Sequence, residues 1–452
     1  MKVKFPNCPL LLSALLAASC SGGGGGSASA SLLESVGLSP SDLQLAPGGS
    51  EQLTVTGTYS NGAVQALPAT GETFHSSNLN VATVSVAGFV TVAANALVGA
   101  SMTITATDNA SGKTTSTAAA ATLTVSAPGK APTPNSASAA TSTAKNNALC
   151  GGPIEPYYWE IGDQHGTLVS GSQGTDVNGK PVLASSKSAV ASASKWLYAT
   201  YVTQVRGSPA LLTSQDTNFL HFTSGYTNMG NSSGTVCPNT LSPDDVDECL
   251  TLDNPQGVAF SARDPATVGR FYYDSGHMEN HASQFTALGK VDVNSLGGTI
   301  AAQLGPGVDL AFGEPLISGG AFTSALDYAL VLRRILDGTL FMHGALGTNP
   351  VCTLKTGACD AAYSPIPEAW HYSIGHWVED DPSTNGDGAF SSPGSFGFYP
   401  WIDSGKSYYG IISRVQAPEV GEQHGYASVK CGRLIRHAWI TGVEQTQPMP
   451  TN

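Results

Sequence analysis

The chain has 452 residues, of which 41% are hydrophobic and only 12% are charged. This much apolar material supports a large core and excludes wholesale disorder, and the length favours two or three domains. The net charge of −13 argues against a nucleic-acid partner, because phosphate binding needs clustered cations. No apolar run of about 18 residues occurs, so no membrane-spanning helix is expected.

Residues 1–20 are predicted to be a signal peptide. Two lysines precede an apolar run, Leu10–Ala18, that is too short to span a bilayer. The run ends in Leu-Ala-Ala-Ser-Cys, which resembles a bacterial lipobox and implies lipidation of Cys20; cleavage as a plain secreted protein is the alternative. Residues 21–30 are small and Gly-rich and are predicted to be a flexible tether. The chain is therefore expected to be exported, either secreted or held at the cell envelope, at the outer membrane, by a lipid anchor alone.

Export places the cysteines in an oxidising compartment, where disulfides persist. Six cysteines remain once Cys8 leaves with the signal and Cys20 takes the lipid, and six allow 15 pairings. Spacing favours two local loops and one bridge between the ends of a domain, which gives the pairs Cys237–Cys249, Cys352–Cys359 and Cys150–Cys431. A zinc site is the competing interpretation, but no Cys-x-x-Cys pattern supports it.

Residues 31–127 are predicted to be all-β. Short alternating segments recur at a spacing of roughly ten residues, which is typical of a β-sandwich. These segments are Gln52–Thr56, Val81–Val84, Gly88–Val92, Met102–Ala106 and Ala121–Val125, and Asn61-Gly62 supplies a hairpin turn. The run resembles bacterial immunoglobulin-like group 2 modules, with Phe74 where such modules often carry Trp. The resemblance implies either a module that binds a cell-surface or polymer ligand or a passive stalk.

Residues 128–148 contain three prolines followed by Ser, Ala and Thr, and are predicted to be a linker. Residues 149–445, which hold all six tryptophans, are predicted to be one large α+β domain. Its expected strands are 157–163, 166–169, 396–402 and 408–415, and its expected helices are 192–205, 325–336 and 428–442. The first and last strands are expected to share one sheet.

The sharpest chemical signal is Ser192-Ala-Ser-Lys195 at the start of a predicted helix. Positions i and i+3 share a helix face, so the Lys195 amine can reach the Ser192 hydroxyl. A serine needs a base to become a nucleophile, and a lysine serves when burial lowers its pKa. The neighbouring residues are apolar, which fits that requirement. Taken alone, the pattern describes equally well a helix with a surface Ser and Lys.

Further segments repeat the order found in one enzyme group. Phe271-Tyr-Tyr273-Asp-Ser275-Gly follows Ser192, and Ile317-Ser-Gly-Gly-Ala-Phe-Thr-Ser comes later. Together they resemble the serine hydrolases of the class C β-lactamase and penicillin-binding-protein group. The resemblance implies an antiparallel sheet with a helical subdomain, Ser192 as the nucleophile, Lys195 as its partner and Tyr273 as a proton shuttle. Ser275 stands where Asn is commoner, so a shorter hydrogen-bonding side chain is available there to a substrate amide.

The third motif of that group, usually Lys-Thr-Gly or His-x-Gly on an edge strand, has two candidates. Residues 355–357 match Lys-Thr-Gly literally but lie between two cysteines with no strand pattern, so we interpret them as a disulfide loop. The better candidate begins at Ser392 and includes Gly394 and Ser395, with the backbone N–H groups of Ser192 and Ser395 as the oxyanion hole. Ser392 replaces the motif's Lys, which pairs with substrate carboxylates in the family. The loss favours esters or amides over β-lactams and D-peptides.

Two other features are open to interpretation. The pair His277 and His281 has metal-ligand spacing, but the order is not His-Glu-x-x-His and no third ligand is evident. We therefore expect polar residues beside the site, no metal and no cofactor. Four aromatic residues near the third motif fit an acyl pocket and ordinary core packing equally well: Trp370, Trp377, Tyr399 and Trp401.

The sequence thus supports two functions from different classes. The favoured one is an exported, membrane-tethered serine hydrolase that cleaves a small or oligomeric ester or amide through an acyl-enzyme, with a β-lactamase or D-peptidase less favoured. The other is a non-catalytic surface adhesin or binding protein that retains the fold, as Ser275 and the missing Lys allow. Neither function involves nucleic acid. The Ser192, Lys195 and Tyr273 set favours the enzyme.

Overall fold

The computed structural model describes residues 31–39, 41–45, 47, 50–67, 71–93, 96–116, 119–125, 131–230, 237, 244–355, 359–384, 386–415 and 422–448. They form two units with separate hydrophobic cores, one drawn from the N-terminal strands and one from the rest of the chain. The predicted signal peptide, the tether and Cys20 lie outside the described residues. No helix in the described part of the chain is long and apolar enough to cross a membrane.

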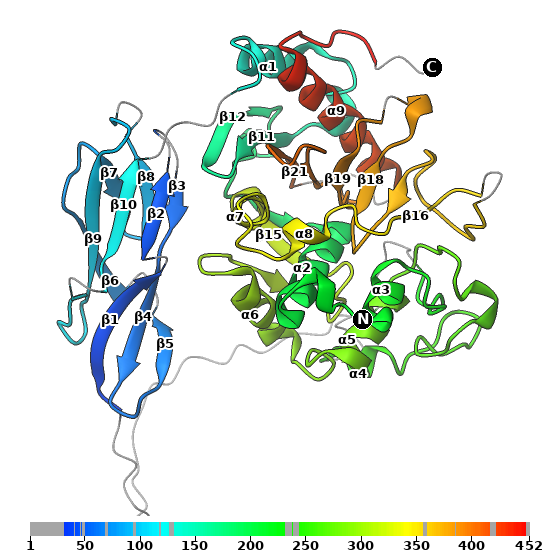
Figure 1. Ribbon diagram of the computed structural model, residues 1–452, viewed down its shortest axis with the longest axis horizontal. Helices are drawn as coiled ribbons and strands as arrows, with labels where there is room; N and C mark the ends of the chain where they lie inside the picture. The colour runs from blue at the N-terminus through cyan, green and yellow to red at the C-terminus, as the bar shows by residue number, and fades with distance from the viewer. Residues whose placement is uncertain are drawn as a thin grey trace, which may run out of the picture.

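The N-terminal unit is all-β, as predicted. Its strands form three small sheets around a core that includes Val55, Val90, Ile104 and Leu123 (Figure 1). The sheets are β1 (Leu33–Ser39), β4 (Thr54–Tyr59) and β5 (Val64–Leu67); β2 (Asp42–Leu45), β10 (Ala121–Val125), β9 (Ser101–Asp108) and β6 (Glu72–Ser76); and β3 (Ser50–Gln52), β8 (Phe89–Val92) and β7 (Ala82–Val84). In β9, buried side chains alternate with more exposed ones, as expected for a strand with one face on a core.

The second unit is built on an eight-stranded sheet in which neighbouring strands are antiparallel. The strand order is β12 (Gly166–Gln173), β11 (Tyr157–Asp163), β21 (Tyr409–Arg414), β20 (Tyr399–Ile402), β19 (Ala389–Ser391), β18 (Trp377–Glu379), β17 (His371–Tyr372) and β16 (Val351–Cys352). β11 pairs with β21, with Trp159 opposite Ile412. The prediction that the first and last strands share a sheet is therefore confirmed.

Helices cover both faces of this sheet: α1 and α9 lie on one side and α7 lies on the other (Figure 1). The helices are α1 (Ser136–Asn146), α2 (Ser194–Arg206), α3 (Ser214–Leu220), α4 (Val246–Cys249), α5 (Gly276–Phe285), α6 (Val293–Leu304), α7 (Ala325–Leu336), α8 (Met342–Ala345) and α9 (Glu422–Thr441). The predicted helix 325–336 matches α7, and the Ser324 hydroxyl accepts the Asp327 N–H as the predicted cap. The domain is α+β.

The predicted linker 128–148 is wrong over its second half. Residues 136–146 form α1, which packs against α9 through small side chains such as Ala140 and Ala144. The Asn147 side chain donates to the Gln445 carbonyl at 2.7 Å, which adds a polar tie to the C-terminal segment. The Ala/Ser/Thr composition that suggested a linker instead allows a close helix–helix approach, and the second domain begins before residue 149.

All three predicted disulfides are present. Cys150–Cys431 joins the start of the domain to α9, and both residues are fully buried. Cys237–Cys249 and Cys352–Cys359 close short loops. A bridge across 281 residues restricts the unfolded chain far more than the two local bridges do.

Two buried arginines of α9 join it to the segment 368–387. Arg436 donates to Glu379 at 2.7 Å, to both carboxylate oxygens of Asp387 at 2.7 and 2.8 Å, and to the Tyr399 hydroxyl at 2.8 Å. Arg433 donates to both oxygens of Glu368 at 2.9 Å. These charge-assisted bonds satisfy cations that would otherwise be costly to bury.

Candidate active site

Ser192 lies on a strained turn between β13 (Lys187–Ala189) and α2. Ala191, just before it, has φ +46°, a left-handed conformation that non-glycine residues seldom adopt. The small sheet of β13, β15 (Ala321–Ser324) and β14 (Ala311–Phe312) holds this turn, since the Val190 N–H donates to the Ala321 carbonyl at 3.0 Å. The Tyr328 hydroxyl of α7 donates to the Ala193 carbonyl at 2.9 Å. The strain persists because the surrounding structure fixes the turn from two sides.

Lys195 lies one turn into the same helical segment, and its Nζ donates to Ser192 Oγ at 3.1 Å. A second bond from Nζ goes to the Ser318 carbonyl at 2.9 Å. Lys195 is buried, and burial lowers its pKa to about 8, although Glu279 and Asp274 oppose the shift. No described carboxylate lies within ion-pair distance of its Nζ. The predicted contact between Ser192 and Lys195 is therefore present, with a lysine that is neutral in a large fraction of molecules near pH 8.

Tyr273 lies beside this pair. The Lys195 Nζ is 4.9 Å from the centroid of the Tyr273 ring, and the Tyr273 ring stacks on Trp377 with centroids 5.4 Å apart. Asp274 accepts the N–H groups of Gly276 and Gly230 at 2.7 and 2.8 Å, and burial raises its pKa to about 6. Ser275 is buried at the N-terminus of α5. The structure thus brings Ser192, Lys195 and Tyr273 together.

Two groups that the sequence interpretation missed complete the surroundings of Lys195. One is the Ser318 carbonyl, which accepts from the Lys195 amine. The other is Glu279, a fully buried acid on α5 whose carboxylate accepts the N–H groups of Ile317 and Ser318, both at 2.8 Å. Burial raises the pKa of Glu279 to about 7, against the effect of these bonds and of Lys195. The segment from Ile317 carried a sequence signal through the family resemblance, whereas the role of Glu279 emerges only where α5 meets the 317–320 turn.

The third-motif candidate touches the nucleophile turn. The Ser392 hydroxyl donates to the Ser192 carbonyl at 2.9 Å, so this side chain holds the nucleophile's backbone. Gly394 passes so close to the turn that a Cβ there would lie 2.1 Å from the Val190 carbonyl oxygen, and only glycine fits. The described residues offer no hydrogen-bond acceptor to the backbone N–H groups of Ser192 and Ser395. Such free N–H groups are what an oxyanion hole requires.

The expectation that this motif lies on an edge strand is wrong. It follows β19, which pairs with β20 on one side and β18 on the other. The extra strands β16, β17 and β18 come from the segment between α8 and the motif, and they extend the sheet past the expected edge.

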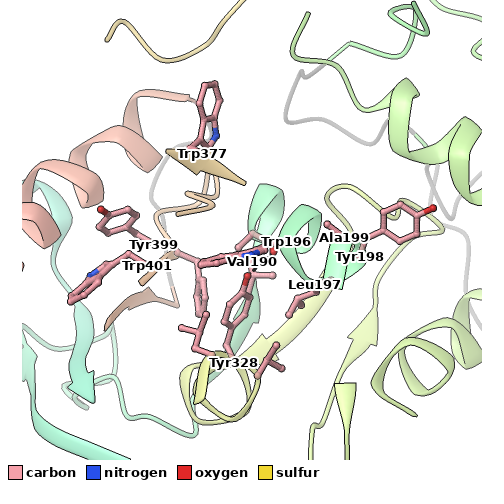
Figure 2. Packing of buried hydrophobic residues seen from close by; sticks show 14 of the residues in the cluster. Val190, Trp196, Leu197, Tyr198, Ala199, Tyr328, Trp377, Tyr399 and Trp401 are labelled. Carbon is pink, nitrogen blue, oxygen red and sulfur yellow. Dashed lines mark hydrogen bonds between the residues drawn. The ribbon is translucent and has the colours of Figure 1, made fainter. Parts of the chain in front are cut away.

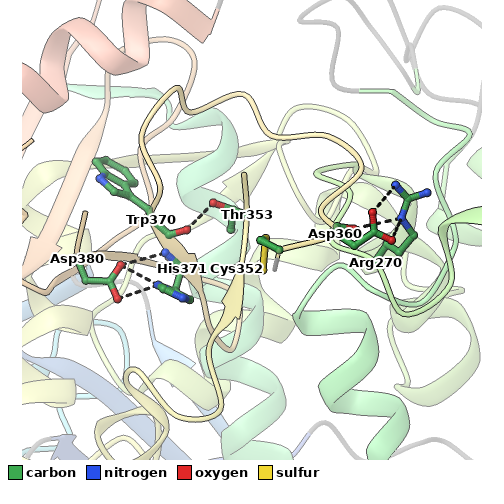
Figure 3. Close-up of a disulfide and its surroundings, with 8 residues drawn as sticks. Arg270, Cys352, Thr353, Asp360, Trp370, His371 and Asp380 are labelled. Carbon is green, nitrogen blue, oxygen red and sulfur yellow. Dashed lines mark hydrogen bonds and ion pairs between the residues drawn. A yellow bond between two sulfur atoms is a disulfide. The ribbon is translucent and has the colours of Figure 1, made fainter. Parts of the chain in front are cut away.

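The competing Lys-Thr-Gly candidate lies in the Cys352–Cys359 loop. Lys355 is exposed and follows β16 rather than standing on a strand, while residues 356–358 lie outside the described residues. Beyond the disulfide, Asp360 pairs with Arg270, as Figure 3 shows. The Tyr273 N–H donates to the Tyr363 carbonyl at 3.1 Å. The segment that follows the disulfide loop therefore contacts the stretch of chain on which Tyr273 lies.

The aromatic cluster near the third motif is core. Its four members are almost completely buried in the core of the second domain: Trp370, Trp377, Tyr399 and Trp401. Figure 2 labels the last three of them. Of the two interpretations left open by the sequence, ordinary packing is supported. Trp377 alone touches the site, through its stacking on Tyr273.

The histidines of α5 bind protein groups. His277 contacts the Ser224 hydroxyl at 2.6 Å, and His281 contacts the Asp216 carboxylate at 2.9 Å. No group of three or more potential metal ligands occurs among the described residues. Both histidines are fully buried, and burial lowers their pKa values.

Comparison with known proteins identifies the first unit. Residues 33–119 match the family model of the bacterial Ig-like domain (group 2), which confirms the resemblance found in the sequence. This match covers only the N-terminal part of the chain. No curated protein matches the sequence.

Solved structures with the β-lactamase or penicillin-binding-protein fold match the second unit. The hydrolase EstCE1, described as having promiscuous acyltransferase activity, is 12% identical, with a TM-score of 0.47, and the match covers 68% of this chain and 98% of that one. Simvastatin synthase (LovD) from Aspergillus terreus is 14% identical, with a TM-score of 0.43, and the match covers 67% and 100%. A β-lactamase from Mycobacterium bovis is 14% identical, with a TM-score of 0.42, and the match covers 65% and 98%. Identities this low leave the chemistry to be inferred from the site residues.

Proposed function

We propose that the second domain is a serine hydrolase that cleaves an ester, or less readily an amide, through an acyl-enzyme on Ser192. One observation carries the proposal: a buried lysine with a lowered pKa donates to the hydroxyl of a serine on a strained turn. A lysine whose amine is free at mildly alkaline pH can act as the base that such a serine needs.

The reaction forms an acyl-enzyme and then hydrolyses it. The neutral Lys195 amine, with Tyr273 as the shuttle, takes the proton from Ser192 Oγ as the oxygen attacks the substrate carbonyl carbon. The carbonyl electrons move onto the oxygen, and the N–H groups of Ser192 and Ser395 stabilise that oxyanion. Collapse of the intermediate expels the alcohol or amine, which takes the proton back. Water then attacks the acyl-enzyme by the same route and releases the acid and free Ser192.

Substrate class follows from Ser392. Its hydroxyl carries no charge and is already bound to the Ser192 carbonyl, so it offers no cation to a substrate carboxylate. Neutral esters are therefore favoured over penicillins and cephalosporins, which carry a carboxylate. The buried aromatic cluster does not add to this preference, because its side chains belong to the core.

A fluorophosphonate probe tests the proposal, because it reacts with an activated serine without knowledge of the substrate. Full-length protein should be labelled at Ser192, and Ser192→Ala should abolish labelling. Ser214→Ala, at an exposed serine of α3, is the matched control and should be labelled like the wild type. Absence of labelling in the wild type, or labelling at another serine, would exclude this mechanism and favour a binding protein.

The N-terminal part suggests where the enzyme works. The Ig-like module and the three disulfides are typical of extracellular or surface proteins. We infer that lipidation of Cys20 anchors the protein and that the Ig-like module acts as a stalk or binds a surface polymer. Cys20→Ser should move the protein from the membrane fraction to the soluble fraction, whereas an unchanged distribution would exclude the anchor.

A further inference from the structure

The carboxylate of Glu279 takes no part in the reaction proposed above. It lies on α5, one turn beyond Ser275, and it is completely buried. Its oxygens are used separately: Oε2 accepts the N–H of Ile317 and Oε1 accepts the N–H of Ser318, each at 2.8 Å. A buried acid with this pattern binds a peptide unit in one orientation, because each oxygen fixes one of two successive N–H groups.

The peptide segment bound by Glu279 also binds the side chain of Lys195. The carbonyl of Ser318 accepts the Lys195 amine at 2.9 Å, and the same amine donates to Ser192 at 3.1 Å. A continuous chain of hydrogen bonds therefore runs from Glu279 through Ser318 to Lys195 and Ser192.

Apart from the bonds to Glu279 and Lys195, the hydrogen bonds of the 317–320 turn lie at its glycine end, where the Gly320 carbonyl accepts the Gly313 N–H at 3.0 Å. Gly319 and Gly320 follow Ser318, and their N–H groups both donate back to the Leu316 carbonyl. Two successive glycines give the backbone many accessible conformations, so the orientation of the Ser318 carbonyl depends on an external anchor. The carboxylate of Glu279 provides that anchor from a different element, α5.

We propose that Glu279 is a positioning residue for the catalytic pair: it fixes the Ser318 carbonyl, and that carbonyl directs the Lys195 amine toward Ser192. The inference rests on the proposed function. It predicts that the carboxylate cannot be replaced by an amide, because the NH₂ group of Gln would face one of the two N–H donors.

The charge of Glu279 acts on the same lysine. Three titratable groups face the Lys195 amine: Glu279 of α5, Asp274 two residues before α5, and the ring of Tyr273. Both acids raise the pKa of Lys195 against the effect of burial. Removal of the Glu279 charge therefore lowers the pKa of Lys195, whereas a purely structural role for Glu279 leaves it unchanged.

The test measures the rate of Ser192 labelling by a fluorophosphonate across pH, for full-length wild type, Glu279→Gln and Glu279→Asp. Glu279→Gln should slow labelling about tenfold to a hundredfold, as misplacement of a catalytic group does, and should shift the midpoint of the pH profile downward. Glu279→Asp keeps the charge at a shorter reach, so it should slow labelling but keep the wild-type midpoint. Glu160→Gln is the matched control, because Glu160 is equally buried but lies in β11.

The outcomes separate the two proposals. If wild-type Ser192 is not labelled, the proposed function fails. If wild-type Ser192 is labelled and Glu279→Gln matches it in rate and midpoint, or if Glu160→Gln shows the same change, only the role of Glu279 fails. If Glu279→Gln does not fold, Glu279→Asp decides: slower labelling with an unchanged midpoint supports the role, and labelling at the wild-type rate overturns it.

Discussion

Two regions of the second domain, the helix α9 and the start of α2, bury cations in different ways. On α9, Arg436 is surrounded by two carboxylates and a tyrosine hydroxyl, and Arg433 binds both oxygens of Glu368. At the start of α2, Lys195 is equally buried but binds only a hydroxyl and a backbone carbonyl. The nearest acids, Glu279 and Asp274, accept backbone N–H groups instead.

This difference separates buried cations that stabilise the fold from a buried cation that can take part in proton transfer. A paired guanidinium remains charged at every accessible pH and serves to hold α9 on the sheet. An ammonium that is buried without a carboxylate partner gives up its proton more easily, and the pKa of Lys195 falls to about 8. Lys195, the buried cation without a carboxylate partner, is therefore the one able to transfer a proton.

The largest expected effect comes from removing the incompletely paired cation. Lys195→Met should slow fluorophosphonate labelling of Ser192 about 10²- to 10⁴-fold, as loss of a general base does. The free energy of unfolding should stay the same or rise, because an apolar side chain replaces a buried charge without an ion pair. Lys187→Met, at a partly exposed lysine paired with Asp309, is the control and should keep normal labelling. Full labelling of Lys195→Met would remove the lysine from the mechanism.

The opposite result is expected on α9. Arg436→Met removes the ion pairs that Arg436 makes with Glu379 and Asp387, and it should lower the free energy of unfolding by about 3–5 kcal/mol. Urea unfolding followed by tryptophan fluorescence reports on this domain, because all six tryptophans lie in it. Arg270→Met, which breaks the more exposed pair with Asp360, should lower the free energy of unfolding by only about 0–1 kcal/mol. Equal losses from both variants would contradict the structural role of the α9 pairs.

The same contrast explains what was predictable from sequence. Ser192 and Lys195 are three residues apart on one helix, so local geometry alone predicted their contact. Tyr273, Ser275 and the third motif were placed by resemblance, since nothing local relates positions so distant in the chain. Glu279 and the Ser318 carbonyl were missed, because a buried acid and a backbone oxygen acquire their roles only when α5 and the 317–320 turn come together. The helix α1 was missed because small residues in close packing have the composition of a linker.

A smaller effect is expected on substrate choice. The α9 arginines are committed to protein carboxylates, and Ser392 is neutral, so neither region offers a free cation to an anionic substrate. A charge-assisted bond is typically worth about 1.5–3 kcal/mol, so its absence should cost a carboxylate substrate roughly tenfold to a hundredfold in binding. The kcat/KM for p-nitrophenyl butyrate should therefore exceed that for nitrocefin. A clear preference for nitrocefin would instead point to Lys355 as the substrate-binding cation.

The effect that is smallest for each step, about tenfold per pH unit below the pKa, is also the most specific to Lys195. Its amine is the base only when neutral, and its pKa is lowered from 10.5 to about 8, so the neutral fraction rises with pH up to that value. The rate of Ser192 labelling should rise with pH up to about 8 and then level off, after correction for hydrolysis of the probe. An ordinary exposed lysine would give a rate that still climbs beyond pH 9. The α9 arginines do not titrate in this range, so Arg436→Met protein that remains folded should keep the same midpoint. A rate that is flat from pH 5 to 9 would show that no group with the pKa of Lys195 activates the serine.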